Sequence, residues 1–159
     1  MLAYIDTNIL LALSGFDKVD KDTKQLLKKI FYDVDLKIPQ IVLGEALTMI
    51  LSESEQGEMI TNIEKLYNKI EEIKCSVEPF PTTNDEIIQC ASELRKRSDV
   101  VTNMDSLILA HPIMDNNATH FYTKDGALNN FRVFSYIKEL ISNGKRTQEL
   151  NIPEEFTEE

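Results

Sequence analysis

The sequence contains no tryptophan and only two cysteines among its 159 residues. Cys75 and Cys90 are too far apart to form a Cys-x-x-Cys pair, so neither a disulfide framework nor a cysteine-based zinc site is indicated. We expect both to be buried free thiols. His111 and His120 have no metal-type spacing with either cysteine, and we expect structural or solvent-facing roles for them.

Basic residues are also scarce, with 17 Lys and Arg against 27 Asp and Glu and a formal net charge of -10. A strong general affinity for nucleic acid is not expected, because it scales with the phosphates that Lys and Arg neutralise. RNA binding would need a local basic patch or a bound metal. No apolar stretch approaches the ~18 residues of a membrane span. We therefore expect a soluble, cytoplasmic protein without a membrane partner.

The overall composition is that of an ordinary globular protein, with 42% hydrophobic and 28% charged residues. A chain of 159 residues matches one domain, because single domains cluster at roughly 100–150 residues. We predict a single domain over residues 1–148. Residues 149–159 are predicted to be an acidic, frayed C-terminal tail.

Short apolar segments alternate with amphipathic ones along the whole chain. The apolar segments predict strands at 2–5, 36–38, 77–80, 120–123 and 132–134. The amphipathic segments and their capping residues predict helices at 22–32, 40–54, 58–74, 85–97, from 103 onward and at 135–143. Pro112 is expected to kink or shorten the helix that starts at 103. Strands separated by helices indicate an α/β sandwich with a mainly parallel sheet of about five strands.

Four acidic residues stand in apolar segments, where a charge is costly unless it is paired or binds a metal. Asp6 and Asp125 each follow a predicted strand, and ligands bind at the carboxyl ends of parallel strands. Glu45 and Asp105 lie near the starts of helices that should begin at the same edge of the sheet. The four carboxylates are therefore expected to meet there.

Several carboxylates together favour hard cations such as Mg²⁺ or Mn²⁺, and without a cation they would repel one another. Bound ions of this kind lower the pKa of a water and stabilise charge at phosphorus, so phosphodiester hydrolysis is the natural reaction. Taken singly, each acid is also explained as a turn, helix-cap or solvent-facing residue. The combination in this order is what favours a metal site.

The order of these acids resembles the PIN domain family over residues 2 to about 143. The matching motifs are Asp6-Thr7-Asn8, Glu45 on an early helix, Asp105-Ser106-Leu107-Ile108-Leu109-Ala110, and Thr123-Lys124-Asp125. The resemblance implies a three-layer α/β/α fold, Mg²⁺- or Mn²⁺-dependent ribonuclease activity on RNA, and frequently a homodimer. Many short members of the family are toxins that an antitoxin protein neutralises.

The resemblance also assigns roles to single residues. It implies that Asp6, Glu45 and Asp105 are the main metal ligands, with Asp125 as a fourth or water-mediated ligand. Many members carry another acid where this chain has Ala127, so fewer ligands for the metal are expected on that side.

Residues beside the four acids have candidate supporting roles. Asn8, Ser106 and Thr123 can hydrogen-bond neighbouring carboxylates, or act only in turns and caps. The run Arg95-Lys96-Arg97 and Lys124 can contact RNA phosphates, although a solvated helix end explains the run equally well.

Two other functions compete with the ribonuclease. A non-catalytic PIN-like module that binds RNA or protein would fit the acidic surface and Ala127. A phosphatase-like or receiver-type domain ranks low, because a haloacid-type phosphatase would need Asp-x-Asp and position 8 is Asn.

Overall fold

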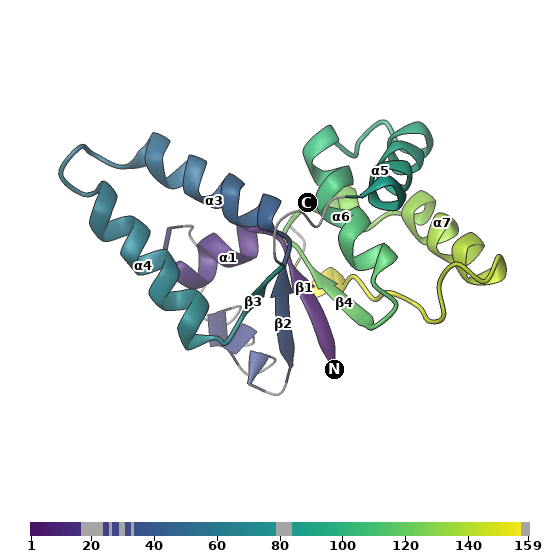
Figure 1. Cartoon of the computed structure of the whole chain (residues 1–159), viewed down its shortest axis with the longest axis horizontal. Coiled ribbons are helices and arrows are strands. Elements are labelled where there is room, and N and C mark those ends of the chain that lie inside the picture. Colours follow the sequence, from purple (N-terminus) through teal and green to yellow (C-terminus); the bar gives the residue numbers. More distant parts are fainter. Residues whose placement is uncertain (17–23, 26, 29–30, 33, 79–83, 157–159) are drawn as a thin grey trace.

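The computed structural model describes residues 1–16, 24–25, 27–28, 31–32, 34–78 and 84–156. Within these residues, four parallel strands form one sheet in the order β3-β2-β1-β4 (Figure 1). The strands are β1 (Leu2–Ile5), β2 (Asp35–Ile38), β3 (Ser76–Val77) and β4 (Ala118–Tyr122). Most of β1 is buried, as expected for an inner parallel strand.

The helices form two groups, one on each side of the sheet (Figure 1). The first group is α1 (Thr7–Ser14), α3 (Gln40–Glu53) and α4 (Met59–Glu72), which pack against one another. The second is α5 (Asp85–Arg97), α6 (Asn103–Met114) and α7 (Phe131–Ser142), in which α5 packs on both α6 and α7. The predicted α/β fold with a parallel sheet and helices on both sides is confirmed.

The strand predicted at 132–134 is wrong, and the described part of the sheet has four strands rather than about five. These residues belong to α7. The side chain of Asn130 caps this helix by accepting from the backbone N–H groups of Arg132 and Val133. The buried residues of α7 recur at helical spacing: Val133, Tyr136, Ile137 and Leu140. A short apolar run at a helix start resembles a strand until this longer period is considered.

Other predicted boundaries hold to different degrees. Helix α6 continues through Pro112 to Met114, so the proline does not end it there. Residues 79–80 of the strand predicted at 77–80, and residues 22–23, 26 and 29–30 of the helix predicted at 22–32, lie outside the described residues. Residues 24–25, 27–28 and 31 are helical. Cys75 and Cys90 are buried free thiols, as predicted. No helix in the described ranges has both the length and the apolar character needed to cross a membrane.

Helix α1 was not predicted, although it begins directly after the first acid. Almost all of its residues are buried, so the sequence lacks the polar face that normally marks a surface helix. Asp6 is its N-cap, and the Asp6 side chain accepts from the backbone N–H of Thr7. Gly15 ends it in the left-handed conformation, with φ 84°. Asp6 and Gly15, which cap its two ends, were the sequence features from which this helix could have been predicted.

The predicted frayed C-terminal tail is also wrong for its described part. Leu150, Ile152 and Phe156 are buried. The backbone of Asn151 exchanges hydrogen bonds with β4 through Phe121 N–H and Thr119 O, each 2.9 Å long. This segment therefore covers the edge of β4, where unpaired backbone groups would otherwise face solvent. Three well-placed apolar residues outweigh the acidic composition around them.

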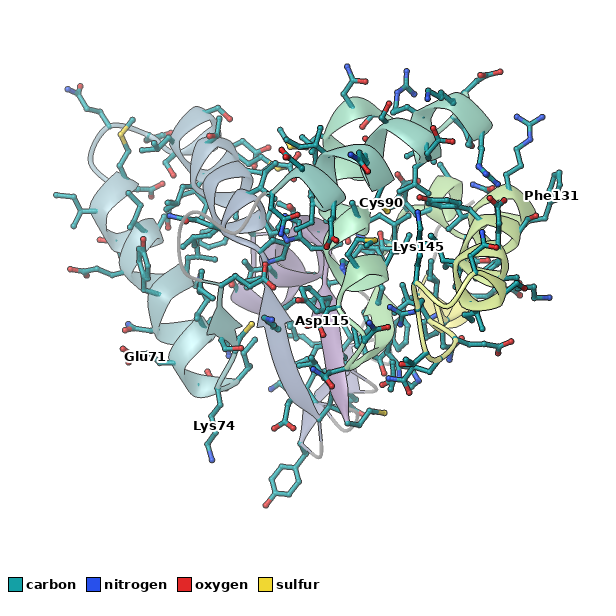
Figure 2. The ribbon with its side chains drawn as sticks, turned by 45° about the vertical axis from the view of Figure 1, so that its right-hand side comes forward. Glu71, Lys74, Cys90, Asp115, Phe131 and Lys145 are labelled. Atoms are coloured by element: carbon teal, nitrogen blue, oxygen red, sulfur yellow. The ribbon has the colours of Figure 1, made fainter. Side chains whose placement is uncertain are left out.

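A network of charged side chains ties β1, β2 and α6 to the residue that follows β3. Glu78 accepts from the hydroxyl of Tyr4 (2.5 Å) and lies 2.9 Å from both Lys37 Nζ and His111 Nδ1. Asp115, labelled in Figure 2, accepts from Lys37 (3.2 Å) and lies 2.9 Å from the Tyr4 hydroxyl oxygen, whose single proton is shared between Glu78 and Asp115. His111 therefore has the structural role expected of it. The network supplies the hydrogen-bond partners that water would otherwise provide for several largely buried polar groups.

Replacing Glu78 by Gln should lower the free energy of unfolding at pH 7 by about 2 kcal/mol. Burial raises the pKa of Glu78, but hydrogen bonds from His111, Tyr4 and Lys37 outweigh it and lower the pKa from 4.5 to about 2. Because the folded-state pKa is depressed, this stabilisation is present above pH 4.5 and is lost as pH falls towards 2.

Urea unfolding between pH 2 and pH 7 measures this effect. At the acidic end, the variant and the wild type should have nearly the same free energy of unfolding. Glu64→Gln, an exposed position on α4, is the matched control and should behave like the wild type. Equal stability of Glu78→Gln and wild type at pH 7 would contradict the assigned role of the network.

Candidate active site

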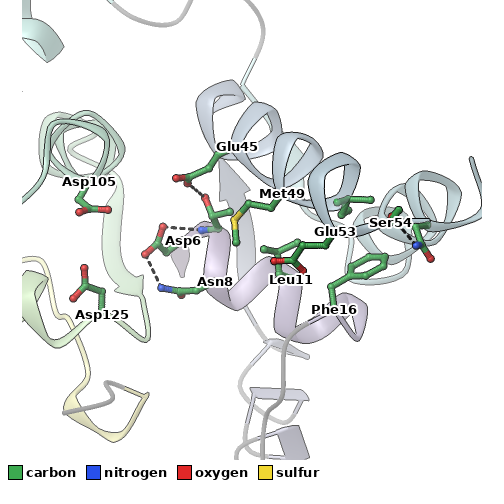
Figure 3. Close-up of a pocket in the computed structure, with 13 residues that line it drawn as sticks. Asp6, Asn8, Leu11, Phe16, Glu45, Met49, Glu53, Ser54, Asp105 and Asp125 are labelled. Carbon is green, nitrogen blue, oxygen red and sulfur yellow. Dashed lines mark hydrogen bonds between the residues drawn. The ribbon is translucent and has the colours of Figure 1, made fainter. Parts of the chain in front are cut away.

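The four predicted acids line one cavity of about 470 Å³ at the carboxyl edge of the sheet (Figure 3). Asp6 follows β1, and Asp125 follows β4. Glu45 lies in α3, and Asp105 lies in the first turn of α6. Four separate elements thus bring together acids that are up to 119 positions apart in the chain, counted from 6 to 125.

Asp6 is the most constrained of the four carboxylates and is only 4% exposed. One oxygen accepts from the backbone N–H of Thr7 (2.7 Å), and the other accepts from Thr123 Oγ1 (2.6 Å) and Asn8 Nδ2 (3.1 Å). Burial raises the pKa of Asp6 to about 6, the hydrogen bonds from Thr123 and Thr7 oppose this, and nearby Asp105 and Glu45 add to it. The site therefore holds a carboxylate whose charge lacks full compensation.

Thr7 connects two of the acids and was not singled out from the sequence. Its backbone N–H donates to Asp6, and its buried hydroxyl donates to Oε2 of Glu45. Glu45 is thus oriented by the residue next to Asp6. The signal was present in the Asp-Thr-Asn motif, where only the first and third residues were given roles.

Asp105 and Asp125 both also serve as helix-capping residues. Asp105 forms a capping box with Thr102: its N–H donates to Thr102 Oγ1 (3.2 Å), and its carboxylate accepts from Thr102 N–H (3.3 Å). One oxygen of Asp125 accepts from the N–H of Ala127 (2.8 Å). Each carboxylate is therefore held by a local turn, as well as facing the cavity.

Of the three residues expected to orient carboxylates, two do so. Asn8 and Thr123 both donate to Asp6, and Asn8 also accepts from the backbone N–H of Lys124 (3.0 Å). Ser106 has the other role that the sequence left open, a local hydrogen bond within its helix, because its hydroxyl donates to the carbonyl oxygen of Asn103 (2.8 Å). Thr123 further accepts from the N–H of Asp125 (3.0 Å), so it links the two acids after β1 and β4.

The basic run expected to contact RNA phosphates is occupied by intramolecular contacts. Arg95 donates to the carbonyl oxygen of Val101, Lys96 pairs with Glu93 (2.6 Å), and Arg97 pairs with Glu139 (2.8 Å). None of them lines the acidic cavity, and neither does Lys124. Among the described residues, the cavity is lined by acids without any Lys or Arg.

The chemistry of these donors fits a hard divalent cation, because the cavity offers carboxylate oxygens from four residues. In the described part of the chain, no three His, Cys, Asp or Glu side chains converge closely enough to hold an ion as they stand. Figure 3 shows Asp105 and Asp125 across the cavity from Asp6 and Glu45. This spread is expected for like charges without a counter-ion, so metal binding requires the carboxylates to approach one another.

A second part of the cavity was not predicted from the sequence. It extends from Asp6 between α1, α3 and α4, where Figure 3 shows Leu11, Phe16, Met49 and Glu53 on the side away from Asp105. Apolar residues of this kind also occur throughout the core. Only the fold distinguishes those that line a cavity from those that fill the interior.

Comparison with known proteins supports the fold and identifies the family. A chain in the crystal structure of VapBC2 from Rickettsia felis, bound to a DNA fragment from their promoter, has a similar fold, with a TM-score of 0.60 and 20% sequence identity. The alignment covers 97% of this chain and 100% of that chain. No curated protein sequence matches. The PIN domain model matches residues 3–133, and PIN domains are generally nucleases. With its sheet, its four acids and this match, the chain belongs to the PIN domain family.

Proposed function

We propose that this protein is a metal-dependent ribonuclease that hydrolyses RNA phosphodiester bonds. The supporting observation is the cavity lined by Asp6, Glu45, Asp105 and Asp125, with no Lys or Arg among its described lining residues. Such a surface repels phosphate on its own. It becomes a phosphodiester site once a divalent cation is bound, so the charge of the cavity itself argues for metal dependence.

In this proposal the four acids hold Mg²⁺ or Mn²⁺. When bound, the ion would lower the pKa of a water and stabilise negative charge at the phosphate. The chain's own residues keep the ligands in place. Asn8, Thr7 and Thr123 fix both oxygens of Asp6, and Thr7 also orients Glu45. Hydrogen-bonded supporting residues of this kind normally set ligand orientation in metal sites.

Labelled single-stranded RNA incubated with purified protein in Mg²⁺, Mn²⁺ or EDTA tests the proposal. Cleavage is expected with either metal and is expected to be lost in EDTA, because the acids then have no cation to bring phosphate into the cavity. Each metal should also raise the unfolding temperature, since a ligand that binds only the folded state stabilises it. Cleavage that persists in EDTA would contradict the metal-dependent site.

The alternative is a PIN-like module that binds RNA or protein without cleaving it. The observation that favours it is Ala127, which stands where many family members carry a further acid, together with the acidic overall charge of the chain. The module predicts RNA retention that survives neutralisation of Asp105 or Asp125, with no metal-dependent product. The ribonuclease predicts a metal-dependent product that is lost when Asp105 or Asp125 is neutralised. The same RNA incubations therefore separate the two functions.

A protein partner is a further part of the proposal. The fold resembles a chain of the VapBC2 structure, and by analogy we propose that a small antitoxin protein neutralises this chain. Apolar side chains exposed on α3 and α4, namely Met49, Leu51, Ile60 and Tyr67, are available for contact with it. A small reading frame just upstream of the gene would support this. The homodimer that the family resemblance implies stays a prediction.

A further inference from the structure

The cavity extends beyond the acids into what we call the apolar arm, formed by Leu11, Phe16 and Met49 with Glu53, Ser54 and Asn62 at its rim. The arm and the acids belong to one continuous cavity (Figure 3). A nucleic-acid strand that places a phosphate at Asp6 therefore places a neighbouring group of the same strand at the arm. For a single-stranded RNA, the neighbouring group of suitable size is a nucleobase.

The arm has the surface that a flat aromatic base requires. Phe16 contributes a ring, while Leu11 and Met49 contribute aliphatic side chains. Proteins bind unpaired bases by stacking them on aromatic rings, and each stacked base adds favourable energy whatever its identity. Lys65 places its ammonium group 5.3 Å from the centre of the Phe16 ring. Lys65 does not itself line the cavity, but its ammonium group beside the arm offers a positive charge for the next phosphate.

The polar rim of the arm limits which base it accepts. Glu53 is a carboxylate, which accepts hydrogen bonds and donates none when ionised. Ser54 Oγ already accepts from Asn62 Nδ2 (2.9 Å). A carboxylate pairs best with two adjacent N–H donors, and among the four RNA bases only guanine presents two such donors side by side, at N1 and N2.

We propose that the apolar arm is a guanine subsite, in which Phe16 stacks on the base and Glu53 accepts from its N1–H and N2–H groups. The inference rests on the proposed ribonuclease function and adds a sequence preference to it. A guanine at one fixed position next to the cleaved phosphate is the consequence. Glu53 acts in recognition only and lies apart from Asp105 and Asp125 (Figure 3).

Sequencing the cleavage ends of a randomised single-stranded RNA pool gives the first test. The wild type should show guanine enriched at one position, and kcat/KM for oligonucleotides with guanine there should exceed that for adenine by about tenfold or more. Inosine lacks the N2 amino group and should fall between them. Glu53→Gln should reduce the guanine preference to within about threefold, because Gln offers only one acceptor. Phe16→Leu should weaken the binding of every base at that position.

Controls separate this inference from the proposed function. Glu55→Gln removes the same charge from an exposed residue outside the cavity and should keep the preference. In parallel, the binding of short guanine- and adenine-containing oligonucleotides to Asp6→Asn is measured. This measurement does not depend on cleavage.

Guanine-selective binding without cleavage would support the subsite while the ribonuclease proposal fails. Cleavage with no fixed guanine would overturn the subsite alone. A preference that Glu53→Gln leaves unchanged would also overturn it, and would leave the arm to a segment of a protein partner.

Discussion

Replacing Asp6 by Asn is expected to lower the rate of RNA cleavage by roughly 10³-fold or more, because the substitution removes the best-positioned of the four carboxylates. The same change should stabilise the metal-free protein. Burial raises the pKa of Asp6 from 3.8 to about 6, so its charge costs folding energy above that pH. Activity and stability should therefore change in opposite directions, which is common at functional sites.

The pH dependence gives the sign of this effect. The folded state binds the Asp6 proton more tightly than the unfolded state does, so the wild type loses stability as pH rises from about 4 to about 6. The full shift corresponds to about 3 kcal/mol. An Asn side chain can keep the hydrogen bond from Thr7 N–H, but its amide faces the donor of Asn8. We therefore expect a net gain of about 1–2 kcal/mol at pH 8.

Three measurements on purified protein check this prediction: RNA cleavage with Mn²⁺, urea unfolding in EDTA at pH 4 and pH 8, and the rise in unfolding temperature on adding metal. Asp99→Asn, the same change at an exposed turn, should match the wild type in all three. A variant that cleaves RNA at the wild-type rate would remove Asp6 from the catalytic site. A variant less stable than the wild type at pH 8 would show that the lost hydrogen bonds outweigh the relieved burial of charge.

The positions of the four acids could be predicted because isolated charges in apolar segments are costly and therefore informative. Parallel topology then fixed the edge at which Asp6 and Asp125 meet. The supporting contacts were less accessible. Ser106 has the same hydrogen-bonding groups as Thr123, but helix geometry turns its hydroxyl to the backbone of Asn103 while Thr123 reaches Asp6. Residue type alone does not distinguish the two.

Segments without contrast between faces were the hardest to assign. Helix α1 is buried on nearly every side, so its apolar run carries no period. The segment around Ile152 has few apolar residues, yet each meets the edge of β4 or the core. Both depend on long-range packing that local patterns do not encode. The same limit hid the apolar arm, since a cavity exists only after α1, α3 and α4 have assembled.

Replacing Arg146 by Met is expected to lower the free energy of unfolding by about 3–5 kcal/mol, the largest stability effect anticipated for a residue outside the acidic site. Arg146 is 1% exposed and has no hydrogen-bonded carboxylate partner among the described contacts. Its guanidinium instead donates to five backbone carbonyl oxygens, those of Pro112, Ile113, Asp115, Ala118 and Gln148, at 2.5 to 3.0 Å. Burial lowers its pKa, with the charge of Asp115 opposing this.

The cost follows from the position of these carbonyls, because they join the end of α6 to the start of β4 and to the segment after α7. Met has a similar length but no donor, so several buried oxygens would lose their partner at once. Arg146→Lys keeps the charge but cannot reach five acceptors with one ammonium, and should lose about 2 kcal/mol. Lys145→Met, at the exposed neighbour labelled in Figure 2, is the matched control. If Arg146→Met unfolded at the same urea concentration as Lys145→Met, the guanidinium would not contribute to stability, and the proposed link between α6 and β4 would be wrong.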